Sequence, residues 1–326
     1  MRVRPCALDA GAAPRGELDA GVTVLQTADM VAASELLAQA TAELADDPRA
    51  LRSMLAIVGA FVADAAATPT HWVYDQAKLE QEVNTHGRSV AFFQPSLNPF
   101  YTRPVGASTC YGEQLLITLR SLVEHGGQVD NRDIGRTIAE TMGINTEYGP
   151  LDTTIFGTRE LPIDGPWRHG SVMHYIQELA NGSDYEEAGG SDDQAEAYVK
   201  SLPVIVSRAG SEDFLETVEE TIRTLQDNDP AVVYGLAAAR VLEEVLLGGS
   251  AAQAASTLPA VLKAPGRANP QPDDRYVANR LDDVLKMAET GSYLESVSTY
   301  GRSYDIKTYL RHDGVEMPTG ATAYLN

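Results

Sequence analysis

The chain has few of the residues that mark several common classes of protein. Of its 326 residues only Cys6 and Cys110 are cysteines, so the sequence predicts neither a disulfide framework nor a cysteine-based zinc site. Lys and Arg total 25 against 46 for Asp and Glu, which gives a formal net charge of -21. Because such a surface repels phosphates and anionic headgroups, we expect no nucleic-acid partner and no membrane partner. A reducing, cytoplasmic location fits the small number of cysteines.

Long apolar runs and several catalytic motifs are also missing. No uninterrupted apolar run reaches the roughly 18 residues that cross a bilayer. Residues 1–28 lack the apolar core of a secretory signal, so we interpret them as a flexible arm. The sequence has no Gly-rich phosphate loop, no Ser nucleophile elbow and no CxxC pair. His169 and His174 lie about 140° apart around an ideal helix, which is not the arrangement of a helical zinc pair.

Helical periodicity dominates what is present, and strand patterns are few. We therefore predict an all-α fold, with residues 29–326 as a single domain. The centre of 49–67 is apolar on all sides, which predicts a buried helix. Residues 87–111 are rich in Pro and aromatics and are predicted to be an ordered loop, while 300–326 show no sustained period. The predicted helices are 29–44, 49–67, 113–124, 132–142, 170–181, 192–210, 212–226, 230–248, 250–262 and 280–291.

Acidic residues stand at two of the predicted helix starts. Glu113, in "STCYGEQLL", either provides a favourable negative charge at a helix N-terminus or belongs to a metal-binding site. Asp192 and Asp193, in "GGSDDQAEAYV", precede another helix, where Ser191 or one of the aspartates could serve as the N-cap.

A polar group follows the apolar helix 49–67. Asp64 lies among small residues and needs partners, because an unpaired buried carboxylate is costly. It either bonds to a nearby loop or forms the polar floor of a ligand pocket. His71 and Trp72 follow a Pro turn and could stack on a sugar or base, although aromatics after a helix are more often core residues.

Five segments in collinear order carry the clearest pattern: "GAFVADAAATPTHWVYD", "NPFYTRPVGASTCYGEQLLITLRSLVEHGG", "GPWRHGSVMHYIQELANG", "GGSDDQAEAYVKSLPVIVSRAG" and "QDNDPAVVYGLAAARVLEEVLLG". Together they resemble the ADP-ribosylglycohydrolase family, and within it the branch that includes the J1 crystallins. The resemblance covers residues 51–248 and implies a compact all-α domain in which 249–326 are divergent or incomplete and pack poorly. Active members use two Mg²⁺ or Mn²⁺ ions to release ADP-ribose from a protein side chain.

The resemblance also implies which residues form the site. The family's Thr-Asp-Asp-Thr motif falls on residues 111–114, where only Glu113 keeps a carboxylate, and no Gly-Asp-rich segment follows Gly248. Asp64 matches the aspartate of an earlier family motif. These matches imply a degenerate metal site in which Glu113 is the metal ligand or general base. Ligand-binding roles are implied for Asp64, His71, Trp72, Tyr111, Asp192 and Asp193.

Three functions remain open from the sequence. The first is a degenerate family member that binds a nucleotide-sugar or an ADP-ribosylated protein. The second is an active metal-dependent hydrolase of ADP-ribosyl bonds that requires Mg²⁺ or Mn²⁺. The third is a non-catalytic, crystallin-like structural protein, which the acidity of the chain would also suit.

Overall fold

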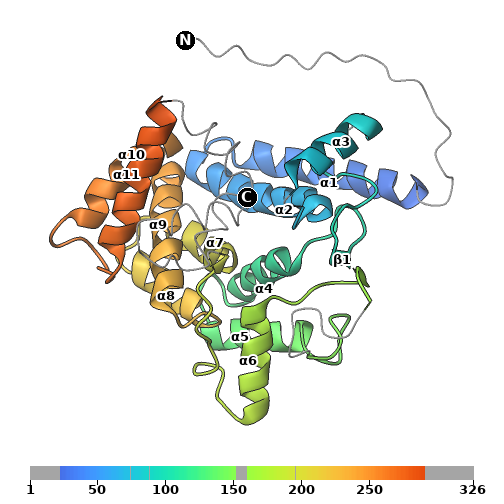
Figure 1. The fold of residues 1–326 in the computed structure, drawn as a ribbon. Coiled ribbons are helices and arrows are strands. Elements are labelled where there is room, and N and C mark those ends of the chain that lie inside the picture. The colour runs from blue at the N-terminus through green and yellow to red at the C-terminus, as the bar shows by residue number, and fades with distance from the viewer. Residues whose placement is uncertain (1–22, 74, 88, 152–159, 195, 291–326) are drawn as a thin grey trace. The chain divides into compact units, whose positions relative to one another are not determined.

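The computed structural model describes residues 23–73, 75–87, 89–151, 160–194 and 196–290, and helices make up nearly all of their regular structure (Figure 1). The predicted all-α fold is confirmed. These residues fall into two units, one ending at Leu51 and one starting at Arg52. The helices are α1 Thr23–Glu43, α2 Pro48–Ala67, α3 Gln76–His86, α4 Cys110–Glu124, α5 Asn131–Thr141, α6 Gly170–Asn181, α7 Ala197–Arg208, α8 Phe214–Arg223, α9 Asp229–Leu246, α10 Ala251–Lys263 and α11 Asp274–Thr290.

Side-chain caps explain where several helices begin. Asp130 accepts a hydrogen bond from the amide of Asp133 at the start of α5, and Asn228 does the same for Ala231 at the start of α9. α6 has the predicted bounds. The unpredicted helix α3 follows a capping aspartate, Asp75, and its weak apolar pattern explains why periodicity missed it. Two short parallel strands, β1 (Tyr101–Thr102) and β2 (Ile163–Asp164), pair Tyr101 with Ile163.

The prediction that Ser191 or an aspartate caps the next helix was wrong. α7 begins at Ala197, its N-cap position is Glu196, and no side chain caps it. Asp192 instead accepts a hydrogen bond from the amide of Gln194, which makes a local turn ahead of the helix. At the other end of the chain, α1 begins at Thr23, inside the predicted arm. Residues 1–22 and the predicted irregular ending lie outside the described residues.

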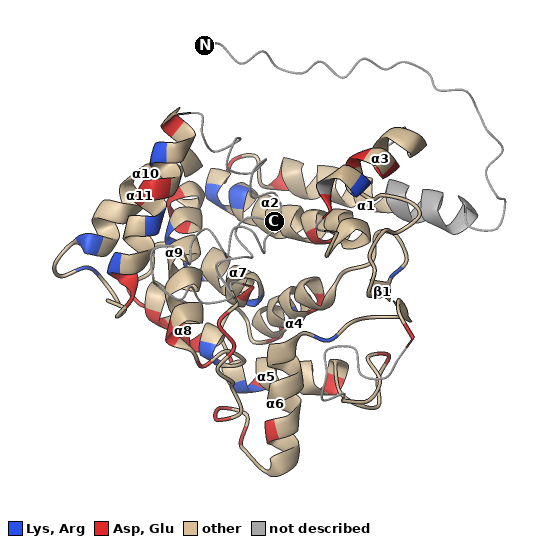
Figure 2. Cartoon of the chain, viewed as in Figure 1, with Lys and Arg blue, Asp and Glu red and all other residues tan. Residues whose placement is uncertain are grey.

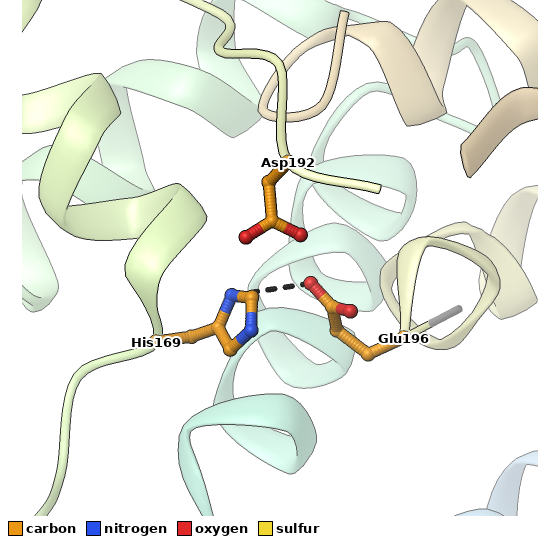
Figure 3. A group of neighbouring side chains, drawn as sticks. All are labelled: His169, Asp192 and Glu196. Carbon is orange, nitrogen blue, oxygen red and sulfur yellow. Dashed lines mark ion pairs between the residues drawn. The ribbon is translucent and has the colours of Figure 1, made fainter. Parts of the chain in front are cut away.

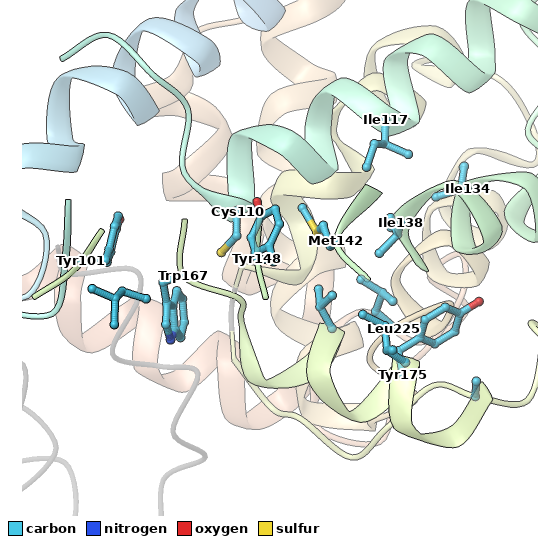
Figure 4. Close-up of a cluster of buried hydrophobic side chains, with 14 residues drawn as sticks. Tyr101, Cys110, Ile117, Ile134, Ile138, Met142, Tyr148, Trp167, Tyr175 and Leu225 are labelled. Atoms are coloured by element: carbon cyan, nitrogen blue, oxygen red, sulfur yellow. The ribbon is translucent and has the colours of Figure 1, made fainter. Parts of the chain in front are cut away.

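The core of the second unit consists of three apolar clusters. The first lies around α4, α5 and α6 and contains Tyr101, Tyr148, Trp167 and Tyr175 (Figure 4). The second forms where α7 packs against α8 and α9. The third joins α9 to α10 and α11. The expectation of poor packing after Gly248 was therefore wrong for residues 251–290, because α10 and α11 bury apolar side chains against α9.

Helix α2 is far more exposed than its apolar sequence predicted. Ala65 is its one buried residue, whereas Leu55 and Val62 are 48% and 52% exposed. A backbone hydrogen bond anchors its C-terminal end: Phe92 donates its amide proton to the carbonyl of Ala66. By length and composition alone the helical stretch Pro48–Thr70 could cross a membrane, and only 6% of the window concerned is buried.

The predicted loop 87–111 is ordered, as expected. Phe93 and Tyr101 are 1% and 2% exposed, and the buried Asn98 accepts backbone hydrogen bonds from Phe100 and Tyr101. Acidic side chains occur on α3, α6, α8 and α11 alike, so the negative charge of the second unit is spread over many elements (Figure 2).

Candidate functional site

Asp64 ties α2 to the N-terminus of α4. The amide of Thr109, the N-cap of α4, donates to Asp64 Oδ2 at 2.8 Å, and the Thr109 hydroxyl donates to Oδ1 at 2.5 Å. A Cβ at Gly112 would lie 2.4 Å from Asp64 Oδ2, so only glycine fits beside this carboxylate. Burial raises the pKa of Asp64, and the Thr109 hydrogen bonds partly offset that rise. Of the two alternatives left open for Asp64, the structure shows the hydrogen bond to a neighbouring segment, at Thr109.

Glu113 lies in the first turn of α4, where the helix dipole stabilises a negative charge. Arg103 Nη2 lies 3.0 Å from Glu113 Oε1, and the Tyr148 hydroxyl donates to Oε2. Both partners come from loops outside α4. Burial raises the pKa of Glu113, while Tyr148 and Arg103 act in the opposite direction. The carboxylate is therefore already neutralised and hydrogen-bonded by its own chain.

A binuclear metal centre does not fit the turn at residues 111–114 as the described residues build it. Hard divalent cations need several free oxygen ligands. Gly112 offers no side chain, and burial raises the pKa of the Tyr111 hydroxyl well above its usual range. The oxygens of Asp64 and Glu113 already accept hydrogen bonds from Thr109, Arg103 and Tyr148. This donor set is too small, and too fully occupied, to hold two ions.

An aromatic cluster lies beside this turn and includes three of the predicted ligand-binding residues. The ring of His71 stacks on Trp72 with centroids 4.3 Å apart, and both rings approach Trp167, at 6.4 and 4.5 Å. Tyr111 lies 6.0 Å from His71 and 5.6 Å from His169. The structure therefore brings His71, Trp72 and Tyr111 together, although they come from two separate segments.

The histidine of this cluster is neutral. The Nδ1 atom of His71 lies 2.9 Å from the Tyr101 hydroxyl, within hydrogen-bond distance. Burial, with a smaller contribution from His169, lowers the pKa of His71 to about 4. At neutral pH His71 therefore offers an uncharged aromatic face.

Asp192 lies close to two residues that were not predicted as site residues from the sequence. His169, at the N-cap of α6, and Glu196, at the start of α7, come together with Asp192 from the loop between them (Figure 3). One ligand atom from each lies within 4.8 Å of the others. The His169 Nδ1 and Glu196 Oε1 atoms are 3.1 Å apart, and the two side chains are 1% and 9% exposed.

Asp193 lies at the edge of this group. It is half-buried, and its charge contributes to the raised pKa of Glu196. Behind the group, Lys200 is buried and donates from Nζ to Gln226 Oε1 at 2.7 Å. Gln226 in turn donates to Asp192 Oδ1 at 3.3 Å. Asp192 is thus held in place by side-chain amides rather than left loose in the loop.

Sequence reasoning missed Arg103, Tyr148, Trp167, His169 and Glu196. His169 was set aside because it forms no i, i+4 pair, yet its partners are 23 and 27 residues away. No sequence motif with a fixed spacing predicts that residues so far apart lie together. The one available signal was the position of His169 just ahead of the predicted helix 170–181, where its ring accepts a hydrogen bond from the Ser171 amide.

A separate groove of about 620 Å³ lies along α8 and α9. Acidic and basic side chains line it, among them Glu216, Glu219, Arg240 and Glu243. None of the predicted site residues borders it. The groove is therefore distinct from the candidate site.

Comparison with known proteins agrees with this structure. The sequence profile of the ADP-ribosylglycohydrolase family matches residues 45–314, so the chain belongs to that family. The match continues past residue 248 through α10 and α11, where the five segments did not reach. Members of this family depend on metal ions and act on ADP-ribosylated substrates.

Two curated relatives are crystallins of Tripedalia cystophora. Crystallin J1A is 30% identical over 199 residues, and crystallin J1B is 29% identical over 198 residues. Each match covers 61% of this chain and 59% of the crystallin. The chain therefore spans less than two thirds of the length of either relative.

Proposed function

We propose that this chain binds a nucleotide-sugar of the ADP-ribose type and does so without the binuclear metal centre of its family. The observation that carries the proposal is the state of Glu113. Its carboxylate, the last acidic group at the family's metal-binding turn, is paired with Arg103 and hydrogen-bonded by Tyr148. A carboxylate held in this way has little capacity left for Mg²⁺ or Mn²⁺.

The aromatic cluster supports a role in ligand binding. His71, Trp72 and Tyr111 are each partly exposed, and their rings lie next to one another. Flat aromatic faces stack on a nucleobase, and a carboxylate such as Asp192 accepts hydrogen bonds from ribose hydroxyls. Asp64 holds α4 beneath this cluster, so its contribution to binding is indirect.

Isothermal titration of the full chain with ADP-ribose tests the proposal. We expect binding in the micromolar to millimolar range, weakened at least tenfold by Trp72→Ala. Tyr276→Ala, which removes a half-buried aromatic residue of α11, is the matched control and should bind as the parent does. No heat at millimolar ADP-ribose would contradict the proposal and favour a structural, crystallin-like role.

One observation favours an active hydrolase as the second candidate. Burial raises the pKa of Glu113, and carboxyl groups with raised pKa values serve as general acids and bases. Release of ADP-ribose from a modified protein in Mg²⁺ or Mn²⁺ would support this candidate if Glu113→Gln abolished it. Glu147→Gln, which removes the other carboxylate that Arg103 contacts, is the control and should leave turnover intact.

A further inference from the structure

A polar group of which the proposed function uses only Asp192 lies at the start of α6 and α7. It consists of His169, Asp192 and Glu196, whose ligand atoms lie within 4.8 Å of one another. His169 and Glu196 hold the N-cap positions of α6 and α7, and Asp192 comes from the segment between these helices. Figure 3 shows the three side chains pointing toward a common centre. None of the three belongs to the family's turn at residues 111–114.

The hydrogen bonding of this group is incomplete. Among the described residues, neither carboxylate oxygen of Glu196 has a hydrogen-bond partner, and His169 Nε2 has none either. All three atoms are buried. Buried polar atoms are almost always satisfied, and an unpaired buried carboxylate is costly. The 3.1 Å contact between His169 Nδ1 and Glu196 Oε1 does not satisfy that oxygen, because it lacks hydrogen-bond geometry.

The charges of the surroundings also leave room for a cation. Asp192 and Glu196 bring two carboxylates, and Lys200 is the buried cation whose charge acts on both of them. Its Nζ is bonded to Gln226, and no ion pair joins it to Glu196 among the described residues. Binding of an ion through His169 Nε2 requires the ring proton on Nδ1, where the Ser171 hydroxyl, 2.8 Å away, accepts it.

We propose that His169, Asp192 and Glu196 bind one divalent transition-metal ion of the Zn²⁺ or Mn²⁺ type. An imidazole nitrogen with two carboxylates suits these ions better than Mg²⁺ or Ca²⁺, which prefer oxygen alone. Tetrahedral zinc with ligands about 2.1 Å away places them about 3.4 Å apart, so ligand atoms that lie as far apart as 4.8 Å need to approach by up to about 1.4 Å. Three protein ligands leave one coordination position open for water or an exogenous ligand.

The environment orients the ligands as metal sites require. Gln194 and Gln226 both donate to Asp192, and the Ser171 hydroxyl lies 2.8 Å from His169 Nδ1. Hydrogen bonds of this kind fix the orientation of the side chains that bind a metal ion. The rings of Tyr111 and Trp167 lie 5.6 and 5.5 Å from that of His169. Apolar surroundings of this kind limit the access of water and strengthen the attraction between carboxylates and the ion.

Metal titration of the untagged full chain, after treatment with chelator, tests this site. We expect one Zn²⁺ or Mn²⁺ per chain with a rise in melting temperature, and much weaker binding of Mg²⁺. Glu196→Gln and Asp192→Asn should each weaken the binding by at least about 100-fold, since even outer partners of metal ligands contribute 10 to 100-fold. Asp184→Asn, an exposed aspartate beside α6, is the matched control and should bind as the parent does.

Two controls keep the outcome clear. Glu196→Gln keeps the size of a buried side chain and should leave the metal-free chain folded. Circular dichroism verifies this, so that lost binding is not mistaken for lost structure. Glu113→Gln should leave the metal affinity unchanged, which separates this site from the family's turn. Absence of 1:1 binding, or binding that Glu196→Gln and Asp192→Asn leave intact, would overturn the proposal. Failure of ADP-ribose binding would not, because the metal titration uses no nucleotide.

Discussion

Arg103 holds two carboxylates at once, with Nη2 3.0 Å from Glu113 and Nη1 2.9 Å from Glu147. The two acidic side chains differ greatly in exposure, at 16% for Glu113 and 58% for Glu147. The inner pair lies at the turn where the family binds metal, and it occupies the carboxylate with a cation from within the chain. The outer pair lies in solvent, where ion pairs contribute little.

Replacing Arg103 with Met should therefore destabilise the chain by about 2 to 3 kcal/mol, because it leaves Glu113 half-buried with Tyr148 as its remaining partner. Glu147→Gln should cost less than about 0.5 kcal/mol. Urea unfolding followed by circular dichroism measures both. If the two substitutions lowered the free energy of unfolding equally, the Arg103–Glu113 pair would stabilise the chain no more than the exposed Arg103–Glu147 pair does.

Gly112→Ala should lower stability by about 1 to 3 kcal/mol, although alanine is the better helix former. Its Cβ would lie 2.4 Å from Asp64 Oδ2 and 2.9 Å from Ser108 Cβ, so the link between α2 and α4 has to shift. Gly59→Ala in α2 is the control, since its Cβ meets nothing within 4 Å, and it should stabilise by about 0.5 to 1 kcal/mol. Thermal melts of both variants decide the point, and a neutral or stabilising Gly112→Ala would contradict the close approach.

His71 contributes a loss of stability as pH drops from about 6.5 toward 4. Its pKa is about 4 in the folded chain and 6.5 in a free side chain, so the folded state resists protonation more than the unfolded state does. The contribution of His71 is complete above pH 6.5 and is lost as pH falls through 4, with an upper limit of about 3 kcal/mol.

Unfolding curves of His71→Gln across this pH range measure that contribution. Glutamine keeps an acceptor for the Tyr101 hydroxyl, and the variant should lose less stability than the parent between pH 6.5 and 4. His86→Gln, which changes an exposed histidine of α3, should follow the parent. Parallel curves for the parent and His71→Gln would show that His71 titrates normally in the folded chain.

The helices were predictable because they are locally encoded. Apolar periodicity and start signals such as Asn228 before Asp229–Leu246 act within one turn of the chain. The burial of α2 was not predictable, since apolar composition does not say whether another element will cover Leu55 and Val62. The sequence indicated that Asp64 needs a hydrogen-bond partner, because it is a carboxylate in an apolar helix. It could not show that the partner is Thr109.

The site could not be predicted in full, because it depends on contacts between residues that are far apart in the sequence. His169 and Glu196 meet because α6 and α7 start side by side, and neither residue is marked by spacing. The resemblance to the family placed Glu113 at the correct turn, yet only the structure showed Arg103 and Tyr148 on its carboxylate. Whether Glu113 acts in catalysis stays a prediction.

The most direct test of the central claim is calorimetric titration of ADP-ribose into the chelator-treated full chain, with and without excess Mg²⁺. We expect saturable binding with the same dissociation constant in both conditions, because the Glu113 carboxylate already interacts with Arg103 and Tyr148. Binding that appears only with Mg²⁺, and that Glu113→Gln abolishes, would contradict it.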